Sequence, residues 1–267
     1  MSRPVTPAAG PWARWRLLAL LAGVAATAVA LLVGLGVVVW TTLAPPATPA
    51  ATPPTSPDAA ASGQAHRDQI AASPMLQVPA AAASTPNIAT GIAATMSLPA
   101  ASGVGAEGVP TGFPHTPEGA VAQLAAIEVR VIEAMSIPLT HRVHAAWSLP
   151  GGVPAEQWAM TGNVQAFLSN VGASDNAKDD TIIVTATPAA GQIKGTDGPD
   201  WVLGCVLLDV RAVVVTQARI GYGHCERLQW SGDRWLIAPG SPPATAPSTW
   251  PGSDLAIRAG WRTLTTG

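Results

Sequence analysis

Apolar and polar residues follow three different patterns along the chain. Residues 17–40, LLALLAGVAATAVALLVGLGVVVW, form an apolar run without a charged side chain. Residues 41–111 are rich in Ala, Pro and Thr, and no helical or strand period runs through them. From residue 112 to 267 the apolar residues recur first with a helical period and then with a strand period. This pattern predicts an apolar N-terminal segment, a disordered linker and one folded domain.

The apolar run of residues 17–40 is long enough to cross a membrane as a helix. At 1.5 Å rise per residue it would span about 36 Å, more than the roughly 30 Å hydrocarbon core. Arginines precede the run within residues 1–16, and the next basic residue is Arg67, so the positive-inside rule places the N-terminal tail in the cytoplasm. A cleaved signal peptide is the alternative, but its apolar region is usually shorter. We therefore predict a single-pass cell-membrane protein whose C-terminal part is extracytoplasmic.

Small residues form a ridge along one side of the predicted span, because they recur every four residues: Ala22, Ala26, Ala30 and Gly34. Such ridges let two helix backbones approach closely, so the span has a surface for packing against a second copy or another membrane protein. An Ala-rich sequence also produces this spacing without any functional pressure, and both interpretations stay open.

The predicted linker, residues 41–111, is too rich in proline to form a regular core. Proline fixes φ and removes backbone donors, so an extended and partly polyproline-like chain is expected. One stretch within it, RDQIAASPMLQVP, is more apolar than its surroundings. This stretch either docks on the folded domain or is an accidental apolar cluster, and its candidate contact residues are Ile70, Met75, Leu76 and Val78.

The folded domain, residues 112–267, is expected to begin with a long helix. Thr116 is a favourable N-cap, Pro117 suits the first helical position and Glu118 complements the helix dipole. The helix should end before Pro138. One apolar stripe follows the cap at helical spacing: Ala120, Leu124, Ile127, Val131 and Met135.

Two shorter helices and a run of strands are expected after this helix. The helices cover residues 140–148 and a segment that starts near Pro154, and a final helical turn can be capped by Ser253. Stretches rich in β-branched and aromatic residues follow the second short helix at residues 181–188, 200–215, 218–230 and 234–239. Helices followed by antiparallel strands predict an α+β domain with the helices packed on one face of the sheet.

The two cysteines, Cys205 and Cys225, lie in successive predicted strands on the extracytoplasmic side of the span. That compartment permits disulfides, and neighbouring strands bring two Cα atoms within the usual bonding separation of about 4.4–6.8 Å. A structural disulfide is therefore expected in preference to two free thiols. Closing a loop of roughly 20 residues should add on the order of 3 kcal/mol of stability.

Several reactive side chains surround Cys225 in the sequence GYGHCER. Strand alternation places Tyr222, His224 and Glu226 on the face opposite to Cys225. Together with Asp209, they are expected to line either a pocket with a general acid and base or a polar face turned to solvent or a partner. Because fold analogy alone supports the enzyme interpretation, a non-catalytic polar face is favoured.

Composition and motifs exclude several other classes of function. Only 11% of residues are charged and the net charge is −2, so no direct binding of nucleic acid is expected. His141 and His144 share one helix face, but two ligands without a third are a weak metal signal. The sequence lacks a phosphate-binding glycine loop, a nucleophile elbow and a zinc-protease motif. We therefore predict no metal, no cofactor and no enzymatic activity.

Three stretches carry a resemblance to a known class of protein: GFPHTPEGAVAQLAAIE (residues 112–128), LPGGVPAEQW (149–158) and GHCERLQWSGDRWLIAPG (223–240). With the tail, span and linker, they make the chain similar to membrane-anchored scaffold proteins of Gram-positive conjugative elements, which use type IV secretion-like machines. The resemblance implies an extracytoplasmic domain with the nuclear transport factor two-like fold, a cone in which a long helix packs on a curved sheet. It implies no catalytic residue.

The preferred function is therefore that of a non-catalytic scaffold or assembly component of a conjugation-type secretion complex. Its expected partners are the membrane, other membrane or envelope proteins of the same complex, and a second copy of the chain. The alternatives are an extracytoplasmic binding module of the cell envelope that is unrelated to DNA transfer and, behind it, a cone-fold enzyme.

Overall fold

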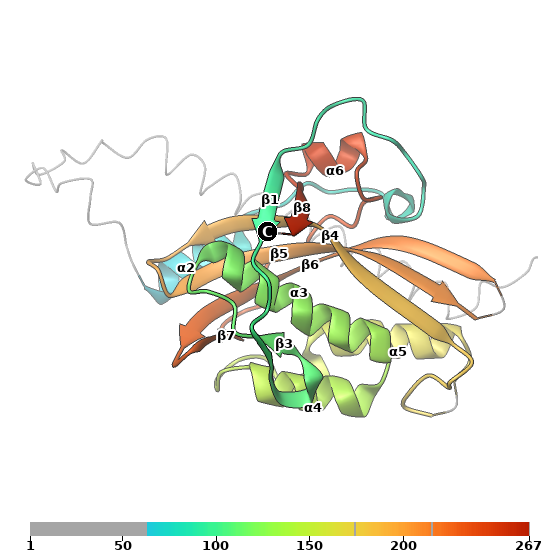
Figure 1. Ribbon diagram of the computed structural model, residues 1–267, viewed down its shortest axis with the longest axis horizontal. Helices are drawn as coiled ribbons and strands as arrows, with labels where there is room; N and C mark the ends of the chain where they lie inside the picture. Colours follow the sequence, from blue (N-terminus) through green and yellow to red (C-terminus); the bar gives the residue numbers. More distant parts are fainter. Residues whose placement is uncertain (1–62, 174, 215, 267) are drawn as a thin grey trace, which may run out of the picture. The chain divides into compact units, whose positions relative to one another are not determined.

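Helices pack on a strongly curled, mostly antiparallel sheet of six strands (Figure 1). The computed structural model describes residues 63–173, 175–214 and 216–266. The sheet has the strand order β1-β8-β4-β5-β6-β7. Its strands are β1 (Thr95–Leu98), β4 (Ile183–Thr196), β5 (Trp201–Val213), β6 (Gln217–Ser231), β7 (Arg234–Ile237) and β8 (Arg262–Thr266). The α+β prediction is confirmed, and the sheet curls into a half-barrel around its helices.

Three helices cover one face of the sheet, namely α3 (Pro117–Ala134), α4 (Ile137–Trp147) and α5 (Ala159–Asn170). The 3-10 turn η3 (Ala155–Gln157) precedes α5. The remaining short elements are α2 (Gln64–Ala72), η1 (Ala80–Ala83), η2 (Ala106–Gly108), α6 (Asp254–Arg258) and a small hairpin of β2 (Gly103–Val104) with β3 (Pro110–Thr111).

The start of α3 follows the sequence prediction. The Thr116 hydroxyl accepts a 3.1 Å hydrogen bond from the Gly119 backbone N–H, and Pro117 occupies the first turn. All five residues of the predicted stripe are buried. The helix ends at Ala134 with Met135 as its C-cap, before Pro138 as expected, and Pro138 then lies in the first turn of α4 after the N-cap Ser136.

The central strand β5 is buried on both faces. Alternate residues Val202, Val206 and Leu208 join the main core with the helices, whereas Cys205 and Leu207 belong to a second apolar cluster on the other face. The apolar residues on the face away from α3 must also be shielded from water by other parts of the chain. Two segments provide this shielding, one before β1 and one after β7.

The segment before β1 corrects the prediction of a linker through residue 111. From Gly63 onward the chain is folded onto the domain: α2 packs Ile70 and Ala71 against a cluster that includes Trp201 and Leu203. The Lys194 ammonium group donates to the Ala71 and Ser73 carbonyls at the C-terminal end of α2. We call residues 63–94 the strap. Its high content of proline and alanine gave no helical or strand period, because only a few apolar residues are needed to anchor it on the sheet.

Charged pairs also hold α2 to the sheet. Arg67 Nε lies 2.7 Å from Asp197 Oδ2, and Arg227 Nη1 lies 2.7 Å from Asp68 Oδ1. Of the four apolar residues proposed for docking, Ile70 and Met75 pack against buried clusters, whereas Leu76 remains 42% exposed. The docking interpretation of this stretch is therefore confirmed for Ile70 and Met75.

A parallel strand pair at the sheet edge was not predicted. β1 pairs in parallel with β8, with Met96 opposite Leu264, and β8 pairs with β4 through Thr263 and Arg262. Both strands are short, and β1 lies within the Ala- and Pro-rich region, so neither gave a clear alternating pattern. The pairing places the C-terminal strand β8 beside β1 at one edge of the sheet (Figure 1).

The membrane predictions concern residues that the structure does not describe. The span at residues 17–40, its ridge of Ala22, Ala26, Ala30 and Gly34, the tail 1–16 and the first part of the linker all lie outside the described residues. Among the helices from residue 63 onward, none has the length and apolar character needed to cross a bilayer.

Candidate functional site

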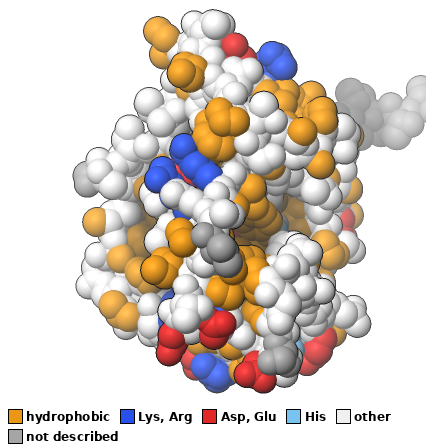
Figure 2. Space-filling model, turned by 90° about the vertical axis from the view of Figure 1, so that its right-hand side faces the viewer, with side chains coloured by type: hydrophobic (Ala, Val, Ile, Leu, Met, Phe, Trp, Pro, Cys, Tyr) orange, Lys and Arg blue, Asp and Glu red, His pale blue; other side chains and the backbone are white. Residues whose placement is uncertain are grey.

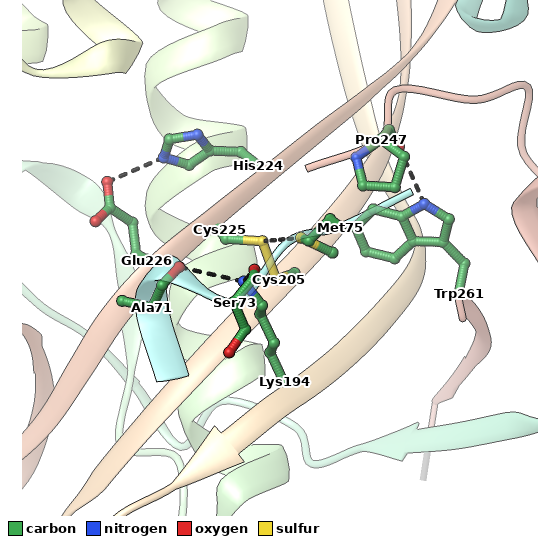
Figure 3. The surroundings of a disulfide bond; sticks show 10 residues. All are labelled: Ala71, Ser73, Met75, Lys194, Cys205, His224, Cys225, Glu226, Pro247 and Trp261. Atoms are coloured by element: carbon green, nitrogen blue, oxygen red, sulfur yellow. Dashed lines mark hydrogen bonds and ion pairs between the residues drawn. A yellow bond between two sulfur atoms is a disulfide. The ribbon is translucent and has the colours of Figure 1, made fainter. Parts of the chain in front are cut away.

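The predicted disulfide between Cys205 and Cys225 is present. The two cysteines are direct partners in the antiparallel register of β5 and β6, their Cα atoms are 4.0 Å apart, and both are buried. The sulfur of Met75 lies 3.6 Å from the Cys225 sulfur, and Trp261 belongs to the same cluster (Figure 3). The strap before β1 and the C-terminal segment therefore shield the disulfide from solvent.

Two glycines of β6 allow the C-terminal segment to approach this face. A Cβ atom on Gly221 would lie 1.8 Å from the Thr249 carbonyl oxygen, and one on Gly223 would lie 2.8 Å from the Pro247 carbonyl oxygen. This close approach of the backbone leaves no room for a larger side chain at either position.

Tyr222, His224 and Glu226 point to the opposite face of β6, toward the helices, as strand alternation predicts. Glu226 Oε1 accepts a 2.7 Å hydrogen bond from Trp158 Nε1 and lies 3.0 Å from His224 Nε2. Figure 3 shows the His224 ring directed at one oxygen of the Glu226 carboxylate. The arrangement can orient the imidazole as a proton acceptor or donor, or it can hold the carboxylate for binding.

Tyr222 is tied to α5. Its hydroxyl accepts a 2.6 Å hydrogen bond from Asn163 Nδ2 and donates toward the Met160 sulfur at 3.3 Å. Burial, with a smaller contribution from Glu128, raises the pKa of the Tyr222 phenol well above its usual range. The phenol therefore stays protonated, and its hydroxyl group is held in place by α5.

Asp209 does not join these residues, which corrects the predicted set of four. It lies opposite Gly221 in the register, on the disulfide face of the sheet. Its carboxylate accepts two hydrogen bonds from Arg219, from Nε at 2.7 Å and from Nη2 at 2.9 Å. The Arg219 guanidinium also lies over the Trp250 ring, 4.3 Å from its centroid. Strand alternation separates Asp209 from the other three, because odd-numbered residues of β5 and β6 share this face.

A cavity of about 530 Å³ lies between the α4–α5 connection, β6 and the segment after β7. Tyr222, His224 and Glu226 line it, together with His144 and Trp158. A second cavity of about 310 Å³ opens between α3, α5 and the ends of β4 to β6. Figure 2 shows hydrophobic side chains around a hollow at that end of the molecule. Tyr222 and Asn163 line both cavities and separate them.

Glu128 of α3 is an interior carboxyl group that the sequence analysis did not select. It is fully buried, and neither carboxyl oxygen has a hydrogen-bond partner among the described residues. Burial, with a smaller contribution from the nearby Glu226, raises its pKa well above the usual range. A signal was present, since Glu128 lies four residues after Leu124 and three before Val131, on the buried stripe of the helix.

The histidines of α4 do not form a metal site with other ligands. No group of three or more His, Cys, Asp or Glu side chains suited to a metal occurs within the part of the chain that the structure describes. The His144 ring lies 5.1 Å from the Trp158 ring. Burial lowers the pKa of His144, although Glu226 acts in the opposite direction, so the imidazole is neutral at neutral pH.

Comparisons with known proteins found no matching family model, no matching curated protein and no matching solved structure.

Proposed function

We propose that this chain is a single-pass membrane protein whose extracytoplasmic domain acts as a non-catalytic scaffold component of a conjugation-type secretion complex. The observation that carries the proposal is the buried disulfide between Cys205 and Cys225. Structural disulfides are typical of extracytoplasmic compartments, and the apolar run of residues 17–40 independently predicts that the domain lies there.

The arrangement of the polar residues supports a non-catalytic role. Asp209 is held by Arg219, Tyr222 by Asn163, and one oxygen of Glu226 by Trp158. These contacts join β6 to α5 or bind one strand to the next, so they contribute to the stability of the domain. The packing of the long helix α3 on a curled sheet also supports a nuclear transport factor two-like cone, the fold implied by the resemblance.

The scaffold proposal is tested by chemical cross-linking of the full-length protein in its native membrane, followed by affinity purification and mass spectrometry. Specific recovery of secretion-apparatus proteins is expected. A chain with residues 1–62 joined to an unrelated disulfide-bonded domain is the matched control, because it keeps the tail, the span and the first part of the linker. Recovery of no apparatus component, or equal recovery with the control, would contradict the proposal.

The cavity next to Glu226 favours a second candidate function, that of an envelope-binding module outside DNA transfer. Its volume of about 530 Å³ falls within the range of ligand pockets. The same cross-linking experiment separates the two functions. Recovery of envelope proteins without any secretion component would favour the second, and a conjugation assay with the deleted gene would then show normal DNA transfer.

A further inference from the structure

The cavity beside β6 combines apolar walls with one carboxylate at its lining. Its apolar lining comes from the α4–α5 connection and from the chain after β7, and includes Leu149, Val153, Ile237, Pro242 and Ala244. Glu226 contributes the carboxylate, and its side chain is only 10% exposed. A hydrophobic pocket with one buried charge selects for a ligand that carries both an apolar stem and a complementary charge.

The second oxygen of Glu226 is available for such a ligand. Both hydrogen-bond contacts of this carboxylate, with Trp158 and His224, fall on Oε1. Oε2 accepts no hydrogen bond from any residue in the described part of the chain, and it is also not among the fully enclosed atoms that lack a partner. A donor that enters the cavity can therefore reach a carboxylate oxygen that the fold leaves free.

The cavity offers this carboxylate no permanent cation of its own. Arg227 lines the cavity, but its guanidinium donates to the Ser241 carbonyl at 2.8 Å and pairs with Asp68 at 2.7 Å. His144 is held neutral by burial, as described above. His224 contacts this carboxylate only at Oε1, so among the described lining residues Oε2 faces no paired cation and complements a positively charged group.

Aromatic rings add to the attraction for a cation. Trp158, Tyr222 and His144 line the same cavity as Glu226. Indole and phenol faces attract ammonium and guanidinium groups, and they also pack against the methylene stems of long side chains. A Lys or Arg side chain has this combination of an aliphatic stem and a cationic end.

We propose that the cavity binds a Lys or Arg side chain of a partner protein, with the cation at Glu226 Oε2 and the stem between Trp158 and the apolar chain after β7. The identification of the occupant as a partner protein rests on the proposed scaffold function. The chain's own linker is unsuited to the role, because residues 17–66 contain no Lys or Arg. The recognised Lys or Arg side chain is therefore assigned to the partner protein.

Binding of the cation is tested with model compounds on the full-length protein in lipid nanodiscs. The probes are N-acetyl-lysine methylamide, the arginine analogue and the neutral N-acetyl-norleucine methylamide, and binding is followed by calorimetry or ligand-observed NMR. The two cationic probes should bind saturably, and at least tenfold more tightly than the norleucine compound. Equal affinity for the cationic and neutral probes would overturn the proposal.

Two variants identify the cavity as the binding site. Glu226→Gln should weaken lysine-analogue binding at least tenfold, whereas the matched variant Asp209→Asn, on the opposite face of the sheet, should leave it unchanged. Val153→Trp keeps the carboxylate and should block the cavity sterically, so it remains informative if Glu226→Gln folds poorly. Undiminished binding in the folded Val153→Trp variant would refute the assignment.

The partner is identified with a photo-cross-linking amino acid at position 153 in the native membrane, with position 183 as the exposed control outside this cavity. Adducts specific to position 153 should map to a peptide that contains Lys or Arg. Recovery of secretion components only from the control position would overturn the cavity proposal and leave the scaffold function standing. Cation binding without any secretion component at either position would leave the cavity standing and contradict the scaffold function.

Discussion

Trp158 donates a 2.7 Å hydrogen bond from Nε1 to Oε1 of Glu226, joining the start of α5 to β6 across 68 residues of sequence. Trp158→Phe keeps most of the apolar surface but removes this donor to a buried charge. The free energy of unfolding should fall by about 1.5–3 kcal/mol, the usual contribution of a hydrogen bond to a charged group. Urea denaturation followed by circular dichroism measures this change.

Trp230→Phe is the matched control for this substitution, because the Trp230 ring stacks on His115 at 4.4 Å between ring centroids. The indole nitrogen of Trp230 makes no hydrogen bond among the described residues. Both substitutions remove the same part of an indole ring, from a buried position at Trp158 and from a half-buried one at Trp230. An equal loss of stability in both variants would mean that packing, and not the bond to Glu226, determines the effect.

Loss of the disulfide should destabilise the domain. The variant with both Cys205→Ala and Cys225→Ala removes a cross-link between residues 20 positions apart. The expected decrease in the free energy of unfolding is about 3 kcal/mol. Equilibrium unfolding with and without a phosphine reductant checks this, since the double variant should be insensitive to the reductant. A wild-type protein that unfolds identically in both conditions would contradict the prediction.

Gly221→Ala should be strongly destabilising, because the new Cβ would lie 1.8 Å from the Thr249 carbonyl oxygen. The backbone must move to relieve the clash. The free energy of unfolding should therefore fall by about 3 kcal/mol. Gly162→Ala, in α5, is the control. A Cβ atom there meets nothing within 4 Å, and alanine should stabilise the helix by about 1 kcal/mol. Thermal unfolding of both variants tests the contrast.

Stability should depend on the protonation of Glu128. Its pKa is raised in the folded chain, so the native state holds this proton more tightly than the unfolded state does. The associated stability is present below the ordinary pKa of 4.5 and is lost as the pH rises toward the higher folded value. Glu128→Gln should therefore reduce the decline in the free energy of unfolding as the pH rises above 4.5.

Asp197 and Asp254, whose pKa values are lowered, affect stability in a more acidic pH range than Glu128 does. Hydrogen bonds to their carboxylates stabilise the charged forms, so their contribution is lost as the pH falls below their ordinary value of 3.8. Denaturation curves at several pH values separate the two effects. An unchanged slope above about pH 4.5 in Glu128→Gln would contradict the role assigned to Glu128.

The boundary of the folded unit can be tested by truncation. A chain that begins at residue 63 should fold, whereas one that begins at residue 112 should be unstable, because it lacks β1 and the cover that Met75 provides for the disulfide. Proteolysis and hydrogen exchange measure the difference. A chain of residues 112–267 with the stability of the longer one would support the domain start predicted from composition.

The features that could be predicted from the sequence are those that depend on residues close together in the chain. The cap at Thr116, the stripe of α3 and the alternation that separates Cys225 from His224 follow from neighbouring residues, and the structure contains all three. The β1–β8 pair and the strap around Met75 depend on contacts more than a hundred residues apart, for which the sequence gives no local pattern.

The candidate site also combines features set by neighbouring residues with features set by distant contacts. Alternation predicted the common face of Tyr222, His224 and Glu226, but a register between strands was needed to place Asp209, and the structure puts it on the other side. Trp158 and Asn163 complete the site from α5, whose position against β6 is set by tertiary packing. Glu128 could have been selected, since a charged residue on the apolar side of an amphipathic helix is a local signal.

The parallel pairing of β1 with β8 also determines how the domain would respond to mechanical force. Tension applied between the N-terminal side of β1 and the C-terminal side of β8 would slide the two strands past each other, so that their hydrogen bonds resist together. A hairpin pulled from its ends opens one bond at a time instead. If a partner grips the C-terminal strand while the chain is held at its N-terminal side, the docked residues 63–94 must detach before the tension reaches this sheet edge, and the β1–β8 pair is then loaded in shear.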